Sequence, residues 1–364
     1  MATTLDQIRR LAASHSLFET DDVADAVARL GYVQADPIRA PARAQDLILR
    51  QRIPGYRSDE LERRYAELPV FEGMFHNYGF FPAGHRPLVY APIPPMERQT
   101  YRWQEYLDEH VVLRRKVLSI LKERGEVHPR ELEQAIGAGA HENGWGGSSS
   151  ATTLMLDALH RAGKARVARR EAGIRIYAPV TERHAALPPA RRADESIRLL
   201  VNLYAPLPQR TLRSLLAVVA RGSSVDHVRR AEALIVKGEL ASVRVEGETW
   251  IMPPALLTAE AAVEERVRLL APFDPVVWDR RRFEHLWGWA YRFEAYTPAA
   301  KRKLGYYALP LLWRDRVIGW ANATMNEGRL DVQCGYINKK PREAAFRIAL
   351  DAEIERLRQF LSDR

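Results

Sequence analysis

The feature of this sequence that most constrains its fold is an internal repeat. Residues 158–180, ALHRAGKARVARREAGIRIYAPV, align with residues 233–255, ALIVKGELASVRVEGETWIMPPA, when Gly163 is placed on Gly238, 75 positions further on. Both stretches have the pattern of a helix end stopped by glycine, followed by two short strands around a turn. The chain therefore contains at least two copies of one structural unit.

Three helices are predicted before the hairpin in each copy, because apolar residues recur there at helical spacing. They cover residues 111–124, 129–137 and 148–163 in the first copy and residues 194–205, 207–217 and 223–238 in the second. Asp194 and Ser224 are the expected N-caps of the first and third helices of the second copy. Three helices followed by a two-stranded hairpin form the winged helix-turn-helix pattern, which binds DNA in many proteins and other proteins in some.

Positive charge is concentrated where a winged helix would meet DNA. The net charge of +9 and the sequence pI of about 9.7 create a field that attracts polyanions, of which nucleic acid is the commonest. An ordinary solvated surface is the alternative interpretation of the same charges. The charged residues in question are Lys164, Arg166, Arg169, Arg170 and Arg175 in the first hairpin and Arg229 and Arg230 in the third helix of the second copy.

The two ends of the chain complete the predicted architecture. The N-terminal part has three helical stretches and resembles a more divergent third unit, ending in an aromatic and proline-rich segment at 68–96 that we expect to be irregular and to lead into a linker. Beyond residue 262, short apolar and aromatic runs separated by turn signals predict several strands, and residues 341–363 form an amphipathic helix. We therefore predict an α+β protein. Its expected parts are tandem winged helix-turn-helix domains at 1–100, 101–185 and 186–260, then a small C-terminal antiparallel β-barrel with a closing helix at 261–364.

Several classes of protein are disfavoured by the composition. No apolar run approaches the ~18–20 residues that cross a bilayer, and the N-terminus lacks the apolar core of a signal peptide. The single cysteine, Cys334, has no partner for an internal disulfide or a thiolate metal site. We therefore expect a cytoplasmic, nucleoid-associated protein without contact to a membrane. Three dissimilar units and no obvious dimerisation helix predict a monomer.

The most informative short stretch is GYVQADPIRAPARAQDLILRQR, residues 31–52, in which Gln34 and Asp36 stand two positions apart before Pro37. A residue that precedes proline is pushed toward extended geometry, and in an extended chain positions i and i+2 project to one side. The two side chains could then face the same water molecule. The alternative is structural, because Asp followed by Pro is also a common helix start, with Asp36 as the N-cap.

At these residues the sequence resembles the AlkZ/YcaQ family of bacterial winged-helix DNA glycosylases. The resemblance rests on LGYVQADPIRAPARAQDLIL near the start, GWGGSSSATTLMLDALHRAGKARVARREAGIRIY in the middle and APFDPVVWDRRRFEHLWGWAYRFEAYTPAAKRKLGYYALPLL near the end. The family's catalytic signature is Gln-aliphatic-Gln in one branch and Gln-aliphatic-Asp in the other, and Gln34-Ala35-Asp36 is of the second, YcaQ-like type. In FEGMFH, Phe71, Glu72 and His76 match the family's pattern, whereas Gly73 and Met74 do not.

The resemblance implies three winged helices and a β-barrel around duplex DNA, and metal-independent, monofunctional removal of alkylated bases without a cofactor. The YcaQ-like branch is associated with N7-alkylguanine and with the unhooking of interstrand crosslinks. The residues agree with that chemistry. N7-alkylation makes guanine a good leaving group, so the remaining task is to stabilise an oxocarbenium-like sugar and deliver water, which a carboxylate can do. Asp36 would activate the water, and Gln34 would position it with its donor and acceptor atoms.

Further candidates for substrate contact are basic residues and one histidine. The basic residues are Arg43, Arg169 and Arg170, the run Arg280, Arg281 and Arg282, and the run Lys301, Arg302 and Lys303, where the last two runs suggest a basic hairpin or an exposed barrel rim. His76 could touch the lesion, or it could be a structural histidine in an aromatic cluster. The ten histidines have no metal-binding spacing, so no metal is expected.

Two functions are therefore compared below. The first is a DNA glycosylase acting on double-stranded DNA that carries alkylated or crosslinked guanine. The second is a non-catalytic winged-helix transcriptional regulator, which would bind DNA without changing it. Regulators of that kind usually read palindromes as dimers, which the three dissimilar units disfavour.

Overall fold

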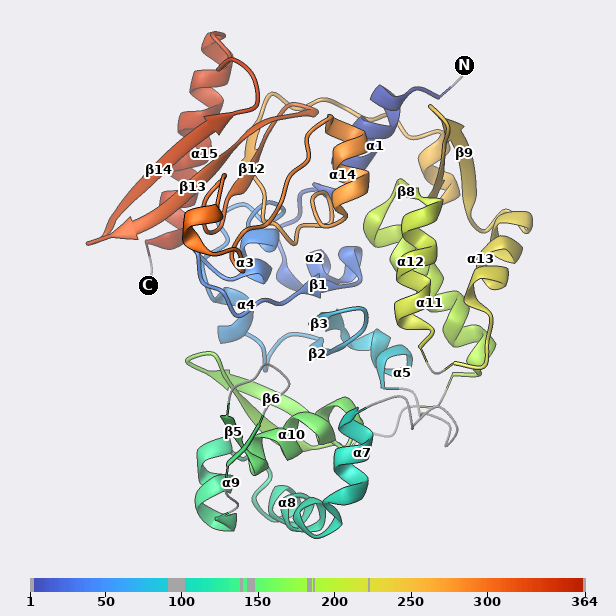
Figure 1. Ribbon diagram of the computed structural model, residues 1–364, viewed down its shortest axis with the longest axis vertical. Coiled ribbons are helices and arrows are strands. Elements are labelled where there is room, and N and C mark those ends of the chain that lie inside the picture. The colour runs from blue at the N-terminus through green and yellow to red at the C-terminus, as the bar shows by residue number, and fades with distance from the viewer. Residues whose placement is uncertain are drawn as a thin grey trace.

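The structure is a computed structural model that describes residues 3–90, 102–137, 140–142, 148–181, 185, 187–221 and 223–362. The N-terminal elements lie at the centre of the molecule, between the C-terminal sheet, the helices of residues 189–252 and the elements of residues 102–179 (Figure 1). A single cluster of buried apolar residues runs through all of these parts. No helix among the described residues is long and apolar enough to span a membrane.

The N-terminal part is built around a small antiparallel sheet. Its elements are α1 (Leu5–Ser16), α2 (Val23–Leu30), β1 (Val33–Gln34), α3 (Ala44–Leu49), α4 (Glu60–Arg63), β2 (Val70–Met74), β3 (Tyr78–Pro82), η1 (Ala83–His85) and α5 (Arg86–Val89). The strands are arranged in the order β1-β3-β2. The prediction of an irregular segment at 68–96 is wrong for residues 70–82, which form the hairpin β2–β3 and bury Phe71, Phe80 and Phe81. Residues 91–96 lie outside the described part of the chain.

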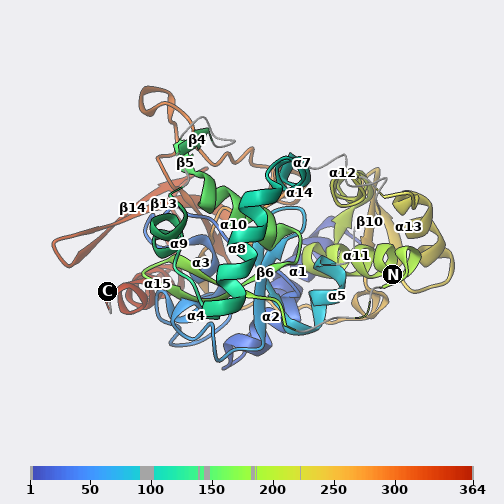
Figure 2. The same cartoon turned by 90° about the horizontal axis from the view of Figure 1, so that it is seen from below.

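The first copy of the repeat has the predicted order of elements, with two additions, helix α7 and the strand pair β4–β5. Its elements are α7 (Arg102–Glu109), α8 (Val111–Arg124), α9 (Pro129–Ile136), β4 (Ala140–Glu142), β5 (Ser148–Ser150), α10 (Ala151–Arg161), β6 (Ala165–Glu171) and β7 (Ile174–Pro179). Strands β6 and β7 pair as the expected hairpin. The short pair β4–β5 was not predicted, and Figure 2 shows it at one edge of the molecule, beyond the end of α10.

The second copy repeats this order. Its elements are α11 (Pro189–Tyr204), β8 (Leu207–Pro208), α12 (Gln209–Val219), α13 (His227–Val236), β9 (Ala241–Val245), β10 (Glu248–Met252) and η2 (Pro254–Leu257), and the strands form a sheet in the order β8-β10-β9. Both predicted N-caps are wrong. Asp194 lies inside α11, where it accepts hydrogen bonds from Arg230, and Asp226 rather than Ser224 caps α13 through the N–H of Arg229.

The C-terminal part is an open sheet rather than a closed barrel. Its elements are β11 (Val267–Leu269), α14 (Arg280–Trp287), η3 (Ala299–Lys301), β12 (Leu309–Trp313), β13 (Arg316–Asn326), β14 (Arg329–Tyr336) and α15 (Ala344–Leu361), and the strand order is β11-β12-β13-β14. The predicted barrel fails because the long segment between β11 and β12 supplies α14, η3 and proline-containing turns in place of strands.

The closing helix packs on the sheet as predicted. Phe346 of α15 meets the ring of Trp313 at 5.7 Å, and Leu350 and Leu357 are buried. Buried ion pairs join the C-terminal part to the N-terminal part. They link Arg50 to Glu353 at 3.0 Å and Arg52 to Asp274 at 2.8 Å. The segment that follows α3 is thereby held against the C-terminal elements.

Candidate active site

Asp36 lies in a non-helical loop directly after β1. Strand β1 pairs with β3, with Gln34 opposite Gly79, and the N–H of Ala35 donates to the carbonyl of Tyr78 at 3.0 Å. The pairing of β1 with β3 therefore continues as far as Ala35, the residue before Asp36. A side chain at Gly79 would bring a Cβ within 2.4 Å of the carbonyl oxygen of Val33, so this close pairing requires glycine.

The helix-cap interpretation of Asp36 is wrong. The described residues 35–43 contain no helix, and α3 begins only at Ala44. The Oδ1 atom of Asp36 instead accepts a hydrogen bond of 2.9 Å from the N–H of Ile38, which is the turn that aspartate makes with its own backbone two residues on. Asp36 therefore has no helix N-terminus to stabilise.

The surroundings of Asp36 favour the protonated form of its carboxyl group, compared with a carboxyl group in bulk water. Partial burial raises the pKa of the Asp36 carboxyl group, and the hydrogen bond from Ile38 offsets part of this rise. Two phenols lie within electrostatic reach of the same carboxylate. Burial, followed by the charge of Asp36, raises the pKa of both Tyr296 and Tyr307. Both phenols therefore lie close enough to Asp36 to respond to its charge.

Gln34 is held at the edge of the same site. Its side chain is 7% exposed, and its Oε1 atom accepts a long hydrogen bond of 3.4 Å from Nδ2 of Asn77. Asn77 belongs to the turn between β2 and β3, so the hairpin brings this amide to β1. Sequence reasoning missed Asn77, because its position beside Gln34 depends on the pairing of β1 with β3.

His76, in the same turn, lies in an aromatic cluster. Its ring contacts the rings of Tyr32 at 4.9 Å and Trp278 at 5.2 Å, and Nε2 is 2.8 Å from the hydroxyl of Tyr204. Burial lowers the pKa of the His76 imidazole to about 3, so the ring is neutral at neutral pH. Nδ1 is buried and has no hydrogen-bond partner among the described residues. These contacts agree with His76 as a structural histidine in an aromatic cluster, whose Nδ1 makes no hydrogen bond within the described part of the chain.

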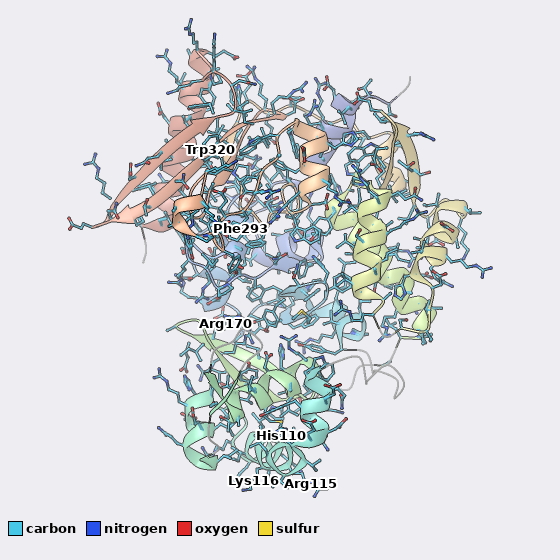
Figure 3. The ribbon with its side chains drawn as sticks, viewed as in Figure 1. His110, Arg115, Lys116, Arg170, Phe293 and Trp320 are labelled. Carbon is cyan, nitrogen blue, oxygen red and sulfur yellow. The ribbon has the colours of Figure 1, made fainter. Side chains whose placement is uncertain are left out.

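Arg43 and Arg170 form ion pairs with buried carboxylates. Arg43 pairs with Glu62, and Arg170 binds both oxygens of Glu72 at 2.6 and 2.7 Å. Figure 3 places Arg170 where the β6–β7 hairpin meets the rest of the molecule. Arg170 thus ties the first repeat to the N-terminal sheet, and Arg43 lies against Gly173 in the turn of the same β6–β7 hairpin. Arg169 is more exposed and pairs with Glu126 and Glu171 at the surface.

The two basic runs near the C-terminus do not form a hairpin. Arg280, Arg281 and Arg282 begin helix α14, and the second run lies at the end of η3 and just after it. Arg280 and Arg281 are exposed, but Arg282 is 1% exposed and donates to the backbone carbonyls of residues 205, 206, 275 and 276. Because its donors are used inside the protein, we remove Arg282 from the predicted DNA contacts.

The second basic run remains at the surface. Lys301 and Lys303 are exposed, and Arg302 is half-buried, with its guanidinium 4.9 Å above the ring of Tyr306. Among the described residues, no three His, Cys, Asp or Glu side chains are grouped so that they could hold a metal ion.

Comparison with known proteins connects this geometry to one family. A sequence model described as "DNA glycosylase AlkZ-like" matches residues 27–360. Among solved structures, the chain is similar to the Streptomyces sahachiroi DNA glycosylase AlkZ, with a TM-score of 0.66 and 18% sequence identity over 100% of this chain and 98% of that chain. At this identity the structural match shows that the fold is shared.

The fold and the family match define the class as a DNA glycosylase of DNA repair. The chain belongs to the AlkZ-like DNA glycosylase family, which confirms the resemblance predicted from the sequence. DNA is accordingly the substrate that the family implies. Gly73 is one of the two positions that differ from the pattern expected for the family. A Cβ at this position would lie 2.7 Å from the side chain of Val89, so the packing favours glycine.

Proposed function

We propose that this protein hydrolyses the N-glycosidic bond of N7-alkylguanine in duplex DNA, with Gln34 and Asp36 as the catalytic pair of a YcaQ-like site. The observation that carries the proposal is the state of Asp36. It is a partly desolvated carboxyl group in the loop after β1, with one hydrogen-bond partner among the described residues and no helix to cap. Such a group is available for chemistry.

The leaving group of this reaction needs little catalytic assistance. An N7-alkylated guanine departs as a neutral base, and the sugar develops positive charge as the bond breaks. Ionised Asp36 would offset that charge and take a proton from the attacking water, while the amide of Gln34 holds the water through its donor and acceptor atoms. No step requires a metal or a cofactor, and we propose that the activity is independent of both.

DNA would be held by exposed cations around this site. We propose that Arg280, Arg281, Lys301, Arg302 and Lys303 contact phosphates, with Arg169 as a further contact from the β6–β7 hairpin. Arg43 and Arg170 act in the proposal by placing the hairpins rather than by binding DNA. We propose that the three units are winged helices that hold a monomeric protein on the duplex. Crosslinked guanine is the bulkiest of the proposed substrates.

A single experiment distinguishes the enzyme from a winged-helix regulator. A duplex with one N7-methylguanine is incubated with the protein in EDTA, and free base and alkali-labile abasic sites are measured. The proposal predicts release of the base with one abasic site per base released and no strand cleavage before alkali. Binding without release would support a regulator, and release that stops in EDTA and returns with a divalent metal would overturn metal independence.

A further inference from the structure

The loop from Phe293 to Tyr307 carries a pair of aromatic side chains that the proposed chemistry does not use. Tyr296 is 75% exposed and Tyr306 is 44% exposed. Within the described ranges these are the only phenylalanine, tyrosine or tryptophan residues classed as exposed. Large aromatic surfaces are usually buried, so two exposed rings on one loop indicate a surface that binds something.

This loop is held in place by buried hydrogen bonds. One carboxylate oxygen of Glu294, which is itself buried, accepts hydrogen bonds from the N–H groups of Lys303 and Leu304 at 2.8 Å and from that of Gly305 at 3.4 Å. Nδ2 of Asn322, on β13, donates to the carbonyl of Leu304 at 2.7 Å. The exposed rings are therefore presented by a fixed backbone, which lowers the entropy lost on binding.

The rings are backed by further aromatic residues. Phe293 lies 6.0 Å from the ring of Tyr296 and 5.0 Å from that of Tyr307, both at nearly right angles, and Figure 3 shows Phe293 below the C-terminal sheet. Tyr307 is buried, and its hydroxyl has no partner among the described residues. Phe293 and Tyr307 thus pack beneath the exposed ring of Tyr296, and the hydroxyl of Tyr307 is a hydrogen-bond donor without a partner among the described residues.

Charge and position identify the occupant. Lys301 and Lys303 are exposed on the same loop, and Arg302 lies over the ring of Tyr306. Cations interleaved with exposed rings are what a nucleic acid strand requires, since phosphates pair with the cations and bases stack on the rings. The loop is also within electrostatic range of the catalytic candidate, because the charge of Asp36 acts on both Tyr296 and Tyr307.

We propose that Tyr296 and Tyr306 stack on bases at or beside the damaged nucleotide, so that this loop presents the lesion to Asp36 and determines which lesions fit. The inference rests on the proposed glycosylase function for the identity of the lesion. The contact itself is a binding event, and it can be measured without any chemistry.

The test uses a duplex with a tetrahydrofuran abasic analogue beside 2-aminopurine, whose fluorescence changes when a ring stacks on it. We expect Tyr296→Ala to lose the fluorescence change and to bind this duplex about 5- to 100-fold more weakly, the range expected for one lost base–aromatic stack. Tyr296→Phe, which keeps the ring, should retain the fluorescence change. Ile348→Ala is the matched control, because it truncates a 70% exposed apolar side chain on α15.

The outcomes separate this inference from the proposed function. If Tyr296→Ala binds and changes the fluorescence as the wild-type protein and Ile348→Ala do, the stacking role is overturned, whatever the wild-type protein does to N7-methylguanine. Equal losses in Tyr296→Phe and Tyr296→Ala would also overturn it, because they would assign the effect to the hydroxyl. If the wild-type protein releases no base but Tyr296→Ala still loses the contact, the stacking role holds and the proposed reaction fails.

Discussion

Asp36, in the loop after β1, and Glu72, on β2, are two carboxylates of the N-terminal part, and their surroundings differ in almost every respect. Glu72, on β2, is fully buried and accepts hydrogen bonds from Arg170 and from the hydroxyl of Tyr78 at 2.8 Å, with Arg175 at 3.7 Å. Asp36 is half-buried and accepts one hydrogen bond from a backbone N–H, among the described residues.

The pKa shifts of the two groups run in opposite directions. Burial alone would raise the pKa of Glu72, but the charge and hydrogen bonds of Arg170 with the charge of Arg175 hold it below its ordinary value. At Asp36 no cation compensates for burial, and the pKa is raised. A carboxylate that is paired on all sides stabilises the fold, whereas one that is partly desolvated and largely unpaired is suited to take up a proton.

The largest effect expected from this comparison is on catalysis by Asp36→Asn. Asparagine can accept the same hydrogen bond from Ile38 but carries no charge, so the rate of base release should fall by about 10²–10⁴-fold while the melting temperature hardly changes. Single-turnover excision of N7-methylguanine and a thermal melt measure the two quantities. A variant with wild-type excision would show that the carboxylate is not catalytic.

The second effect is on stability, through Glu72→Gln. This change leaves Arg170 buried without its full counter-charge, which costs about 3–5 kcal/mol in other buried pairs. Glu355→Gln is the matched control, because Glu355 is exposed and pairs with Arg358 within α15, so the same substitution there should hardly change the unfolding midpoint. Denaturant unfolding compares them, and equal midpoints would mean that the Glu72 network contributes no net stability.

The sequence predicts the repeated elements well because their signals are local. Helical spacing and a stop at glycine identify α8, α10 and the β6–β7 hairpin without reference to the rest of the chain. The extended geometry expected at Asp36 also rests on a local signal, since it follows from Pro37. By contrast, Ser224 and Asp226 are both good N-caps two residues apart, and only the packing of α13 selects Asp226.

What could not be predicted depends on contacts between distant segments. The burial of Arg282 follows from carbonyls at 205 and 206 that turn toward it, and its two neighbours with the same side chain remain exposed. The position of Asn77 beside Gln34 depends on the pairing of β1 with β3. The position of Tyr296 relative to Asp36 depends on how the C-terminal part packs on the N-terminal part. Helix α14 is different, because its start is a local signal that the predicted basic hairpin overlooked: Asp279 caps it through the N–H of Arg282.

A third, smaller effect is expected for Gln34→Ala. If the amide positions the water but does not change its charge, the rate should fall by roughly 3- to 10-fold, the value of one hydrogen bond. Binding to an abasic analogue should not change. A loss as large as that of Asp36→Asn would instead assign Gln34 a direct part in bond cleavage.

The smallest effect is expected at the exposed arginines of α14. Replacing Arg280 and Arg281 by alanine should weaken binding to undamaged duplex and reduce the slope of log affinity against log salt by up to about 2, since each lost phosphate contact contributes about 0.9. Arg358→Ala, an exposed change on α15, should leave the slope unaltered. An unchanged slope in the α14 variant would place that helix end outside the DNA interface.

The central claim is that Asp36 works as a carboxylate whose pKa is raised by its surroundings, and the pH dependence of the single-turnover rate tests it most directly. Only the ionised form can activate water, so the rate should fall tenfold per pH unit below the pKa of Asp36, and that limb should lie above pH 3.9, the ordinary value for aspartate. Circular dichroism over the same range establishes that the protein stays folded. The account predicts that the limb is present in the wild-type protein and absent from Asp36→Asn. A wild-type rate that is constant from pH 4 to 7, or an unchanged limb in Asp36→Asn, would contradict it.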